Sequence, residues 1–408
     1  MAGTVAVAGP PARTVHGREL GLDYLRGSVT FLVIVAHSAL AYATLSVEDT
    51  RHTFIPVVDS SQTSILNFVF YFIDNFPMCL LFLVSGLFVL PGLRSHGVFG
   101  YVRQRLIRLG IPFAVSVVFI VPIAYYFGWL ASGHPAGYFS FWKLDIASGW
   151  SCGPQWTIWE LLLFDFLAAA FFLVIPPKRE ADERPWKPSP VLCFIGMFLG
   201  AALLFIPLAI RFDITAQEPL ALALTGWRRL VTKPFYFQAA RVLMYLFWFA
   251  AGVFLGGKGL ESGPLGKDAP LVRRWPFWTA WAVFCYCLFF GLFMGRFNLA
   301  SQLNLGEKAG TVLFGLVCVL SSTACVFGSL AFFRGAVHTR RPWMDSFTRS
   351  AYIIYLIHYG FVTWIQYRLL TVALPPLAKF AIAVIGTTAV TWAIARVLLR
   401  IPGLKHIV

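Results

Sequence analysis

Long apolar runs recur along the chain, and their length predicts membrane-spanning helices. A helix needs about 20 mainly apolar residues to cross the hydrocarbon core of a bilayer. The runs that reach this length have the approximate limits 25–46, 65–90, 111–131, 155–176, 190–210, 237–256, 276–295, 311–333, 350–370 and 377–399. We therefore predict an all-α integral membrane protein, a polytopic bundle of about ten transmembrane helices. Residues 17–408 would form one transmembrane domain, after a cytoplasmic tail over 1–16 that we expect to be disordered.

The distribution of basic residues predicts the orientation of this bundle. An even number of spans places both termini on one side, and Lys and Arg concentrate in cytoplasmic loops. With the N-terminus inside, the inner segments hold 21 basic residues, whereas the outer segments and their edges hold 10. We therefore predict an N-in, C-in protein. The outer loop 211–236 is basic against this trend, which is consistent with an anionic acceptor or with a helix lying on the outer leaflet.

Composition supports a membrane location and changes the meaning of the net charge. Only 12% of the residues are charged and 58% are hydrophobic, whereas a soluble domain has about 25% charged residues. A net charge of +15 would otherwise favour nucleic acid, but here topology explains most of it, so no nucleic-acid partner is expected. The seven cysteines lack the spacing of a zinc site or disulfide framework, so no metal is expected.

Ionisable residues inside predicted spans are the first candidates for a functional site, because they are costly in lipid and usually face a partner or a cavity. Asp23 and Arg26 are three residues apart in the first span, so they share a helix face and can pair. Arg26 and His37 are eleven apart, which places them on one face again with a rise of about 16 Å. An arginine at the inner rim would then lie below an imidazole near mid-bilayer. The alternative is a snorkelling arginine and a structural histidine.

An arginine pair precedes the third span. Arg105 and Arg108 share one helical face, Arg103 lies close by, and guanidinium groups match the geometry of phosphate oxygens. This pattern indicates a phosphate clamp at the inner surface. The alternative is a topology signal that also contacts lipid headgroups.

Two more intramembrane groups are candidates. Glu160 follows Trp156 by one turn at the start of the fourth span. Its carboxylate could orient an imidazole or polarise a hydroxyl, or it could pair with Arg241 of the sixth span. His358 lies in the ninth span at a depth comparable to that of His37.

These signals occur together in an order that resembles the integral-membrane acyltransferase family 3. The motifs are Leu-Asp-Tyr-Leu-Arg26-Gly with His37, Phe82-Leu-Val-Ser-Gly86, Arg105-x-x-Arg108 before Gly-Ile-Pro112, Gly153-Pro-Gln-Trp156 and Tyr355-Leu-Ile-His358. The resemblance extends from about Gly17 to Val408 and is greatest to the branch of glucan-biosynthesis protein C, which succinylates periplasmic glucans. Two features differ: Thr157-Ile158 stands where the family usually has Phe-Leu, and we expect no appended periplasmic esterase-like domain.

The resemblance implies an O-acyltransferase of the bacterial cytoplasmic (inner) membrane. Acyl-CoA would be a cytoplasmic co-substrate rather than a bound cofactor, with its phosphates held by Arg105, Arg108 and Arg103. The acceptor would be a hydroxyl of an envelope glycan, a polysaccharide or a lipid-linked sugar, and both acetyl and succinyl groups fit. The oligomeric state is left open.

The resemblance also assigns expected roles to the intramembrane residues. His37 would take the proton of the acceptor hydroxyl, since a histidine suits base catalysis near neutral pH, or it would carry the acyl group as an intermediate. Arg26, paired with Asp23, would anchor the donor channel or fix the first span. The remaining candidates for substrate contacts are His358, Glu160 and Trp156.

Two other classes of protein stay open at this point. A lipid-phosphate-dependent glycosyltransferase also has many spans and carries acidic residues in its first outer loop, where this chain has Glu48, Asp49 and Asp59. A proton-coupled transporter would use the two intramembrane histidines as relay groups.

Overall fold

The computed structural model describes residues 19–45, 55–135, 137–176, 186, 188–212, 218–219, 234–261, 263–294 and 299–404. The chain is 78% helical, and the sheet of its described part is a single antiparallel pair, β1 (Glu218–Pro219) and β2 (Tyr236–Phe237). The predicted all-α class is therefore confirmed. The predicted tail over 1–16 and the basic residues 228, 229 and 233 of the outer loop lie outside the described residues.

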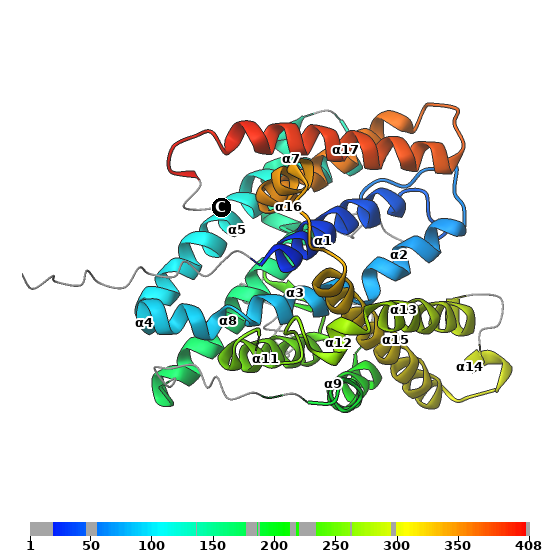
Figure 1. Cartoon of the computed structure of the whole chain (residues 1–408). Coiled ribbons are helices and arrows are strands. Elements are labelled where there is room, and N and C mark those ends of the chain that lie inside the picture. Colours follow the sequence, from blue (N-terminus) through cyan, green and yellow to red (C-terminus); the bar gives the residue numbers. More distant parts are fainter. Residues whose placement is uncertain are drawn as a thin grey trace, which may run out of the picture.

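The described helices are gathered into one bundle (Figure 1). They are α1 (Leu20–Leu40), α2 (Ile65–Asn75), α3 (Pro77–Gly86), α4 (Val89–Arg105), α5 (Ile111–Val115), α6 (Val121–Ala131), α7 (Tyr138–Leu144), α8 (Trp156–Val174), α9 (Pro190–Arg211), α11 (Val242–Lys258), α12 (Pro270–Arg273), α13 (Trp275–Phe289), α14 (Leu299–Gln302), α15 (Glu307–Gly335), α16 (Pro342–Leu369) and α17 (Pro376–Leu398).

Eight helical segments of the described part are long and apolar enough to cross a membrane. They are Leu20–Leu40, Ile65–Gly86, Val89–Ala131, Gly153–Val174, Pro190–Arg211, Trp275–Phe293, Glu307–Gly335 and Pro376–Leu398. The shorter apolar helix α11 and the 28-residue helix α16 overlap the other two predicted runs. The class of polytopic membrane protein is thus confirmed, while the count of ten spans and the N-in orientation stay predictions.

Two predicted spans differ from the apolar pattern for local reasons. The second span is interrupted at Phe76, because Pro77 cannot donate the backbone hydrogen bond that a continuous helix needs. The sixth span was expected from residue 237, but α11 begins only at Val242, because Tyr236 and Phe237 form β2. Both irregular points lie inside the bundle and place polar backbone there.

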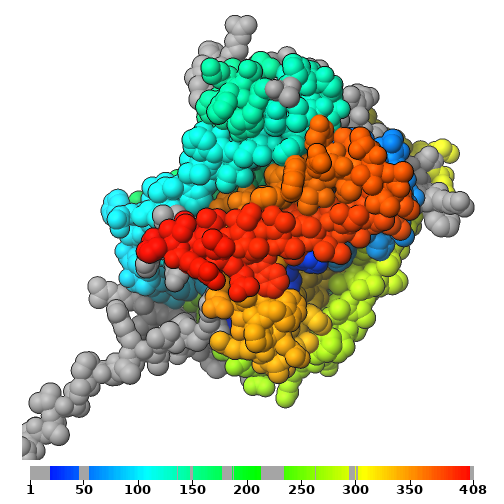
Figure 2. Space-filling model, turned by 90° about the horizontal axis from the view of Figure 1, so that it is seen from above, coloured from blue at the N-terminus to red at the C-terminus, as the bar shows by residue number. Residues whose placement is uncertain are grey.

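Helix α1 lies in the centre of the bundle, where it packs on α16, α2, α15 and α17 (Figure 1). It runs parallel to α16 in a constant register, because the Tyr24–Asp345 and His37–His358 contacts both join residues 321 positions apart. On the face shown in Figure 2, α17 lies across α16 and covers part of this central pair. Helix α17 therefore shields part of the contact between α1 and α16.

Helices α3 and α11 approach each other closely through glycines. A Cβ atom on Gly252 would lie 2.0 Å from the Leu83 carbonyl oxygen, and one on Gly86 would lie 2.2 Å from the Phe249 carbonyl oxygen. Small residues permit such backbone contacts between membrane helices. The contact fixes the position of α11 and of the arginine, Arg241, at its N-terminal end.

Candidate active site

His37 of α1 and His358 of α16 meet inside the bundle. The Nε2 atom of His358 lies 3.2 Å from the Nδ1 atom of His37, and the ring centroids are 5.1 Å apart. The Tyr359 ring packs edge-on against His37 with a centroid distance of 5.1 Å. His358 is completely buried, whereas His37 is only partly buried. The structure therefore joins two histidines that the sequence analysis identified separately.

Backbone carbonyl groups hold both rings. The Nδ1 atom of His37 lies 3.0 Å from the Val33 carbonyl oxygen, and that of His358 lies 2.7 Å from the Tyr355 carbonyl oxygen. A carbonyl oxygen only accepts hydrogen bonds, so Nδ1 is the donor in each ring. In a neutral His37 the lone pair is then on Nε2, which is the nitrogen that a base needs. Gln366 adds a hydrogen bond of 2.9 Å to the His37 carbonyl oxygen.

The first two turns of α1 carry the other predicted residues of this helix. Asp23 is partly buried and Arg26 is exposed. Between them, Tyr24 is buried and donates a hydrogen bond of 2.8 Å to Asp345 of α16. This bond fixes the start of α1 against the start of α16. The predicted Asp23–Arg26 pairing and its role in the donor channel stay predictions.

The predicted phosphate clamp lies where α4 changes into a π-helical turn, Leu106–Gly110. Arg105 is partly buried, and its Nε atom forms an ion pair of 3.2 Å with Asp165 of α8. Tyr101 donates a hydrogen bond of 2.5 Å to the same carboxylate, and its ring lies 4.9 Å from the Arg105 guanidinium. The contact of Arg105 with Asp165 is made through Nε. Arg103 and Arg108 are exposed.

A tyrosine of α16 connects this arginine segment to the histidine pair. The hydroxyl of Tyr352 donates a hydrogen bond of 2.9 Å to the Arg108 carbonyl oxygen. Tyr352 precedes His358 by six residues, which is about 9 Å along a helix axis. The arginines and the histidines therefore lie at two levels along α16.

The start of α8 is attached to α16 one turn before His358. Gln155 donates a hydrogen bond of 3.0 Å to the Leu356 carbonyl oxygen, and the Tyr355 hydroxyl donates to the Pro154 carbonyl oxygen. Thr157, which departs from the usual family residue, lies 2.5 Å from the Tyr355 hydroxyl through its own hydroxyl. Trp156 is mostly buried and stacks on Tyr245 of α11 at 5.9 Å.

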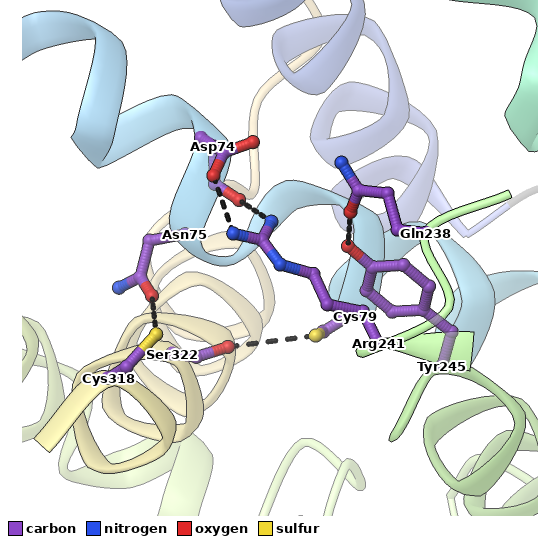
Figure 3. Close-up of polar contacts among 8 residues, drawn as sticks. All are labelled: Asp74, Asn75, Cys79, Gln238, Arg241, Tyr245, Cys318 and Ser322. Carbon is purple, nitrogen blue, oxygen red and sulfur yellow. Dashed lines mark hydrogen bonds and ion pairs between the residues drawn. The ribbon is translucent and has the colours of Figure 1, made fainter. Parts of the chain in front are cut away.

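The pairing of Glu160 with Arg241, one of the alternatives for this carboxylate, is wrong. Figure 3 shows Arg241 bound instead to Asp74 of α2, with 2.8 Å between Nη2 and Oδ2 and a further bond of 3.2 Å to the Asp74 carbonyl oxygen. Pro77 ends α2 at this point, so the arginine satisfies a backbone carbonyl that the break exposes. Glu160 is completely buried, and neither carboxylate oxygen has a hydrogen-bond partner in the described part of the chain. Its expected contact with substrate stays a prediction.

The polar groups around Arg241 connect α2 and α11 to α15 (Figure 3). Asn75 donates a hydrogen bond of 2.9 Å to Ser321 of α15 and accepts one of 3.6 Å from Cys318. Tyr245 donates a hydrogen bond of 3.1 Å to Gln238, which precedes α11. These bonds explain how a charged pair is accommodated between apolar helices, since its remaining polar neighbours are also satisfied.

Other charged and nucleophilic groups are engaged elsewhere. Asp59, an acidic residue on which the glycosyltransferase alternative rested, is 1% exposed and pairs with Lys379 at 2.7 Å; Glu48 and Asp49 lie outside the described residues.

Burial raises the pKa of the Cys152 thiol to about 12, so this cysteine is a poor nucleophile. Among the described residues, no group of three or more His, Cys, Asp or Glu side chains could hold a metal ion.

Sequence reasoning missed several residues that position this site. Gln366, Tyr355 and Tyr352 are polar side chains on α16, at eight, minus three and minus six residues from His358. Gln366 and Tyr355 lie within about 80° of His358 around the helix, which is the signal that could have found them, whereas Tyr352 lies about 120° away. Tyr101 gave no such signal, because its partner Asp165 is distant in sequence.

The fold and the site define an all-α, polytopic membrane protein with paired histidines inside its helical bundle. The profile of an acyltransferase domain, that of acyltransferase family 3, matches residues 19–396. The chain belongs to this family and is a multi-pass membrane acyltransferase of the O-acyltransferase type. The match covers the family as a whole and does not distinguish the glucan-biosynthesis branch. No curated protein and no solved structure matches the chain.

Proposed function

We propose that this acyltransferase moves an acetyl or succinyl group from cytoplasmic acyl-CoA to a hydroxyl of an envelope glycan, a polysaccharide or a lipid-linked sugar. Its location would be the inner membrane of a bacterium. The observation that carries the proposal is the His37–His358 contact at 3.2 Å, in which His37 keeps part of its surface accessible. A base that is held in place and still reachable is what transfer to a hydroxyl requires.

The donor would bind where the arginines lie. Arg108 and Arg103 are exposed, and Arg105 is oriented by Asp165. Guanidinium groups form paired, charge-assisted hydrogen bonds with phosphate oxygens, so these residues suit the phosphates of CoA. The acyl-pantetheine arm would then extend about 9 Å along α16 towards the histidines. Arg26, which is exposed near the start of α1, would border the entry of the acyl-CoA site.

The chemistry follows from the lone pair on Nε2 of His37. This atom would take the proton of the acceptor hydroxyl while the oxygen attacks the thioester carbonyl carbon. The new C–O bond forms, the C–S bond breaks, and the proton on Nε2 passes to the leaving thiolate. The products are the ester and free CoA, and His37 returns to its neutral form. An acyl-histidine intermediate would divide the same transfer into two steps.

The experiment compares cells that express the wild-type chain, His37→Ala or no protein, by mass spectrometry of their envelope glycans and lipids. We expect an acetyl or succinyl mass increment with the wild-type chain and none with His37→Ala. His96→Ala is the matched control, because His96 is an exposed histidine far along the chain from the pair. Membrane levels of all variants are measured in parallel.

The outcomes separate the alternatives. An acyl increment that persists in His37→Ala at normal expression would overturn the assignment of His37 as the base. If the wild-type increment is absent from glycans but present on lipids, the acceptor is a lipid and not a glycan. Purified protein incubated with acyl-CoA and no acceptor, and then analysed intact, would show an acyl adduct only if the intermediate forms.

A further inference from the structure

His358 lies beside the nitrogen of His37 that does not perform the proposed chemistry. Its Nδ1 atom donates to the Tyr355 carbonyl oxygen at 2.7 Å. In a neutral ring, this leaves the lone pair of His358 on Nε2, which faces the Nδ1 atom of His37 at 3.2 Å. The hydrogen on Nδ1 of His37 therefore has two acceptors, namely the Val33 carbonyl oxygen at 3.0 Å and His358.

We propose that His358 is a positioning residue for acyl transfer, which accepts the Nδ1–H hydrogen bond of His37 and so keeps Nε2 of His37 as the base. This inference rests on the proposed function, because it requires His37 to act as that base. His358 would take the role that the carboxylate has in a hydrolase triad, where it orients the catalytic histidine. Here the acceptor is neutral, so no second charge has to be buried in the membrane.

The same contact acts after the proton has moved. When His37 holds the acceptor's proton, its positive charge is shared with Nδ1–H. The lone pair of His358 then faces that charge and stabilises it through a stronger, charge-assisted hydrogen bond. Without His358, only the Val33 carbonyl oxygen would remain as a partner for Nδ1–H.

The surroundings of His358 hold it in this orientation. Tyr355, whose carbonyl oxygen accepts from His358, is itself fixed by hydroxyl bonds to Pro154 and Thr157. On the other side, Gln366 ties α16 to the His37 carbonyl oxygen. The Tyr24–Asp345 bond holds the start of α1 against α16, and the Gln366 bond holds its end. The two rings therefore cannot slide past each other without breaking hydrogen bonds.

The kinetic test compares His358→Leu, which removes the acceptor atom, with His358→Gln, whose side-chain oxygen can accept the same bond. Purified full-length protein in lipid nanodiscs is given acetyl-CoA or succinyl-CoA with a short linear glucan oligosaccharide, and released CoA is quantified by chromatography. We expect kcat of His358→Leu to fall about 10- to 1,000-fold with an unchanged KM for acyl-CoA. His358→Gln should recover at least a tenth of the wild-type kcat.

Three kinetic results would overturn the inference. The first is a wild-type kcat in His358→Leu. The second is a raised KM for acyl-CoA with kcat unchanged, which would make His358 a substrate contact. The third is an equal loss in both variants when both keep the wild-type thermal stability, since the accepting atom would then be irrelevant.

A spectroscopic test does not depend on activity. In protein labelled with ¹⁵N-histidine, the signal of His37 is identified by its loss in His37→Gln. We expect the wild-type signal to report hydrogen on Nδ1, and a hydrogen on Nε2 instead would overturn the inference even if His358→Leu fails to fold. If His37→Ala still transfers acyl groups, the assignment of His37 as the base in the proposed function fails, whereas the tautomer result is unaffected, so the two failures are distinguishable.

Discussion

The Nε atom of Arg105 lies 3.2 Å from Oδ2 of Asp165, and this carboxylate is completely buried. The pair joins α4 to α8 and orients the guanidinium at one end of the bundle. Arg105 therefore has a structural role besides its proposed contact with CoA, whereas Arg108 is exposed. The two arginines of one motif should respond differently to substitution.

For donor binding, we expect Arg108→Ala to keep the thermal stability of the wild-type protein, because exposed substitutions usually change stability by less than about 0.5 kcal/mol. The rise in melting temperature on adding CoA should be smaller in this variant and absent in Arg105→Ala/Arg108→Ala. Arg396→Ala, which removes an exposed arginine of α17, is the control. An undiminished CoA effect in the double variant would exclude both residues from the donor site.

For the ion pair itself, Asp165→Asn leaves Arg105 without its charged partner. Removing one member of a buried pair costs about 3–5 kcal/mol, so thermal unfolding without ligand should occur at a clearly lower temperature. Tyr101→Phe deletes only the 2.5 Å hydrogen bond to the same carboxylate and should cost about 2 kcal/mol. A larger loss in Tyr101→Phe than in Asp165→Asn would show that the ion pair does not hold α4 against α8.

The buried pair of Asp59 and Lys379 gives a second prediction on stability. The two side chains are 1% and 3% exposed, and they join the segment after α1 to the first turn of α17. Lys379→Met should destabilise the protein by about 3–5 kcal/mol, because Asp59 would stay buried and uncompensated. The double variant Asp59→Asn/Lys379→Met should recover part of the loss in the same thermal assay. Equal stability of the single and double variants would contradict this account.

Helix packing yields a third prediction, at Gly252. A Cβ atom at this position would lie 2.0 Å from the Leu83 carbonyl oxygen, which is backbone and cannot give way cheaply. Gly252→Ala should therefore separate α3 from α11 and lower the yield of folded protein in detergent, measured by size-exclusion chromatography. In contrast, a Cβ atom on Gly196 of α9 meets nothing within 4 Å. Gly196→Ala should be neutral or stabilise by up to about 1 kcal/mol, and equal behaviour of the two variants would refute the close contact.

The membrane class and the candidate histidines could be predicted from the sequence, because both depend on composition along single spans. Apolar length reports spanning, and an ionisable residue within a span stands out without knowledge of its neighbours. His37 and His358 were found in this way, each in its own helix. Their contact was not predictable, since the two histidines are 321 positions apart in sequence and meet only because α1 packs parallel to α16.

The pairing of buried charges shows more clearly what the sequence could not predict. A pairing of Arg241 with Glu160 was one of the alternatives, but Arg241 contacts Asp74, because Pro77 breaks the second span next to Asp74 and exposes a carbonyl there. The apolar pattern continues through this break, so it gave no sign of it. Side-chain partners across helices follow from such local breaks and from packing, and the apolar pattern alone displays neither.

The interaction of Glu261 with Arg334 predicts how stability depends on pH at one end of the bundle. Partial burial acts to raise the pKa of Glu261, but the hydrogen bonds from Arg334, at 2.8 Å, and from the Lys267 amide outweigh it, so the pKa lies below its ordinary value. A carboxyl with a lowered pKa in the folded state adds stability above its unfolded pKa of about 4.3, and this stability is lost as the pH falls through the lowered value. Glu261→Gln should therefore melt below the wild-type protein at pH 7, and the difference should shrink below about pH 4. Thermal unfolding in detergent between pH 3 and pH 7 measures this, and a difference that is constant over the whole range would show that the charge of Glu261 does not contribute.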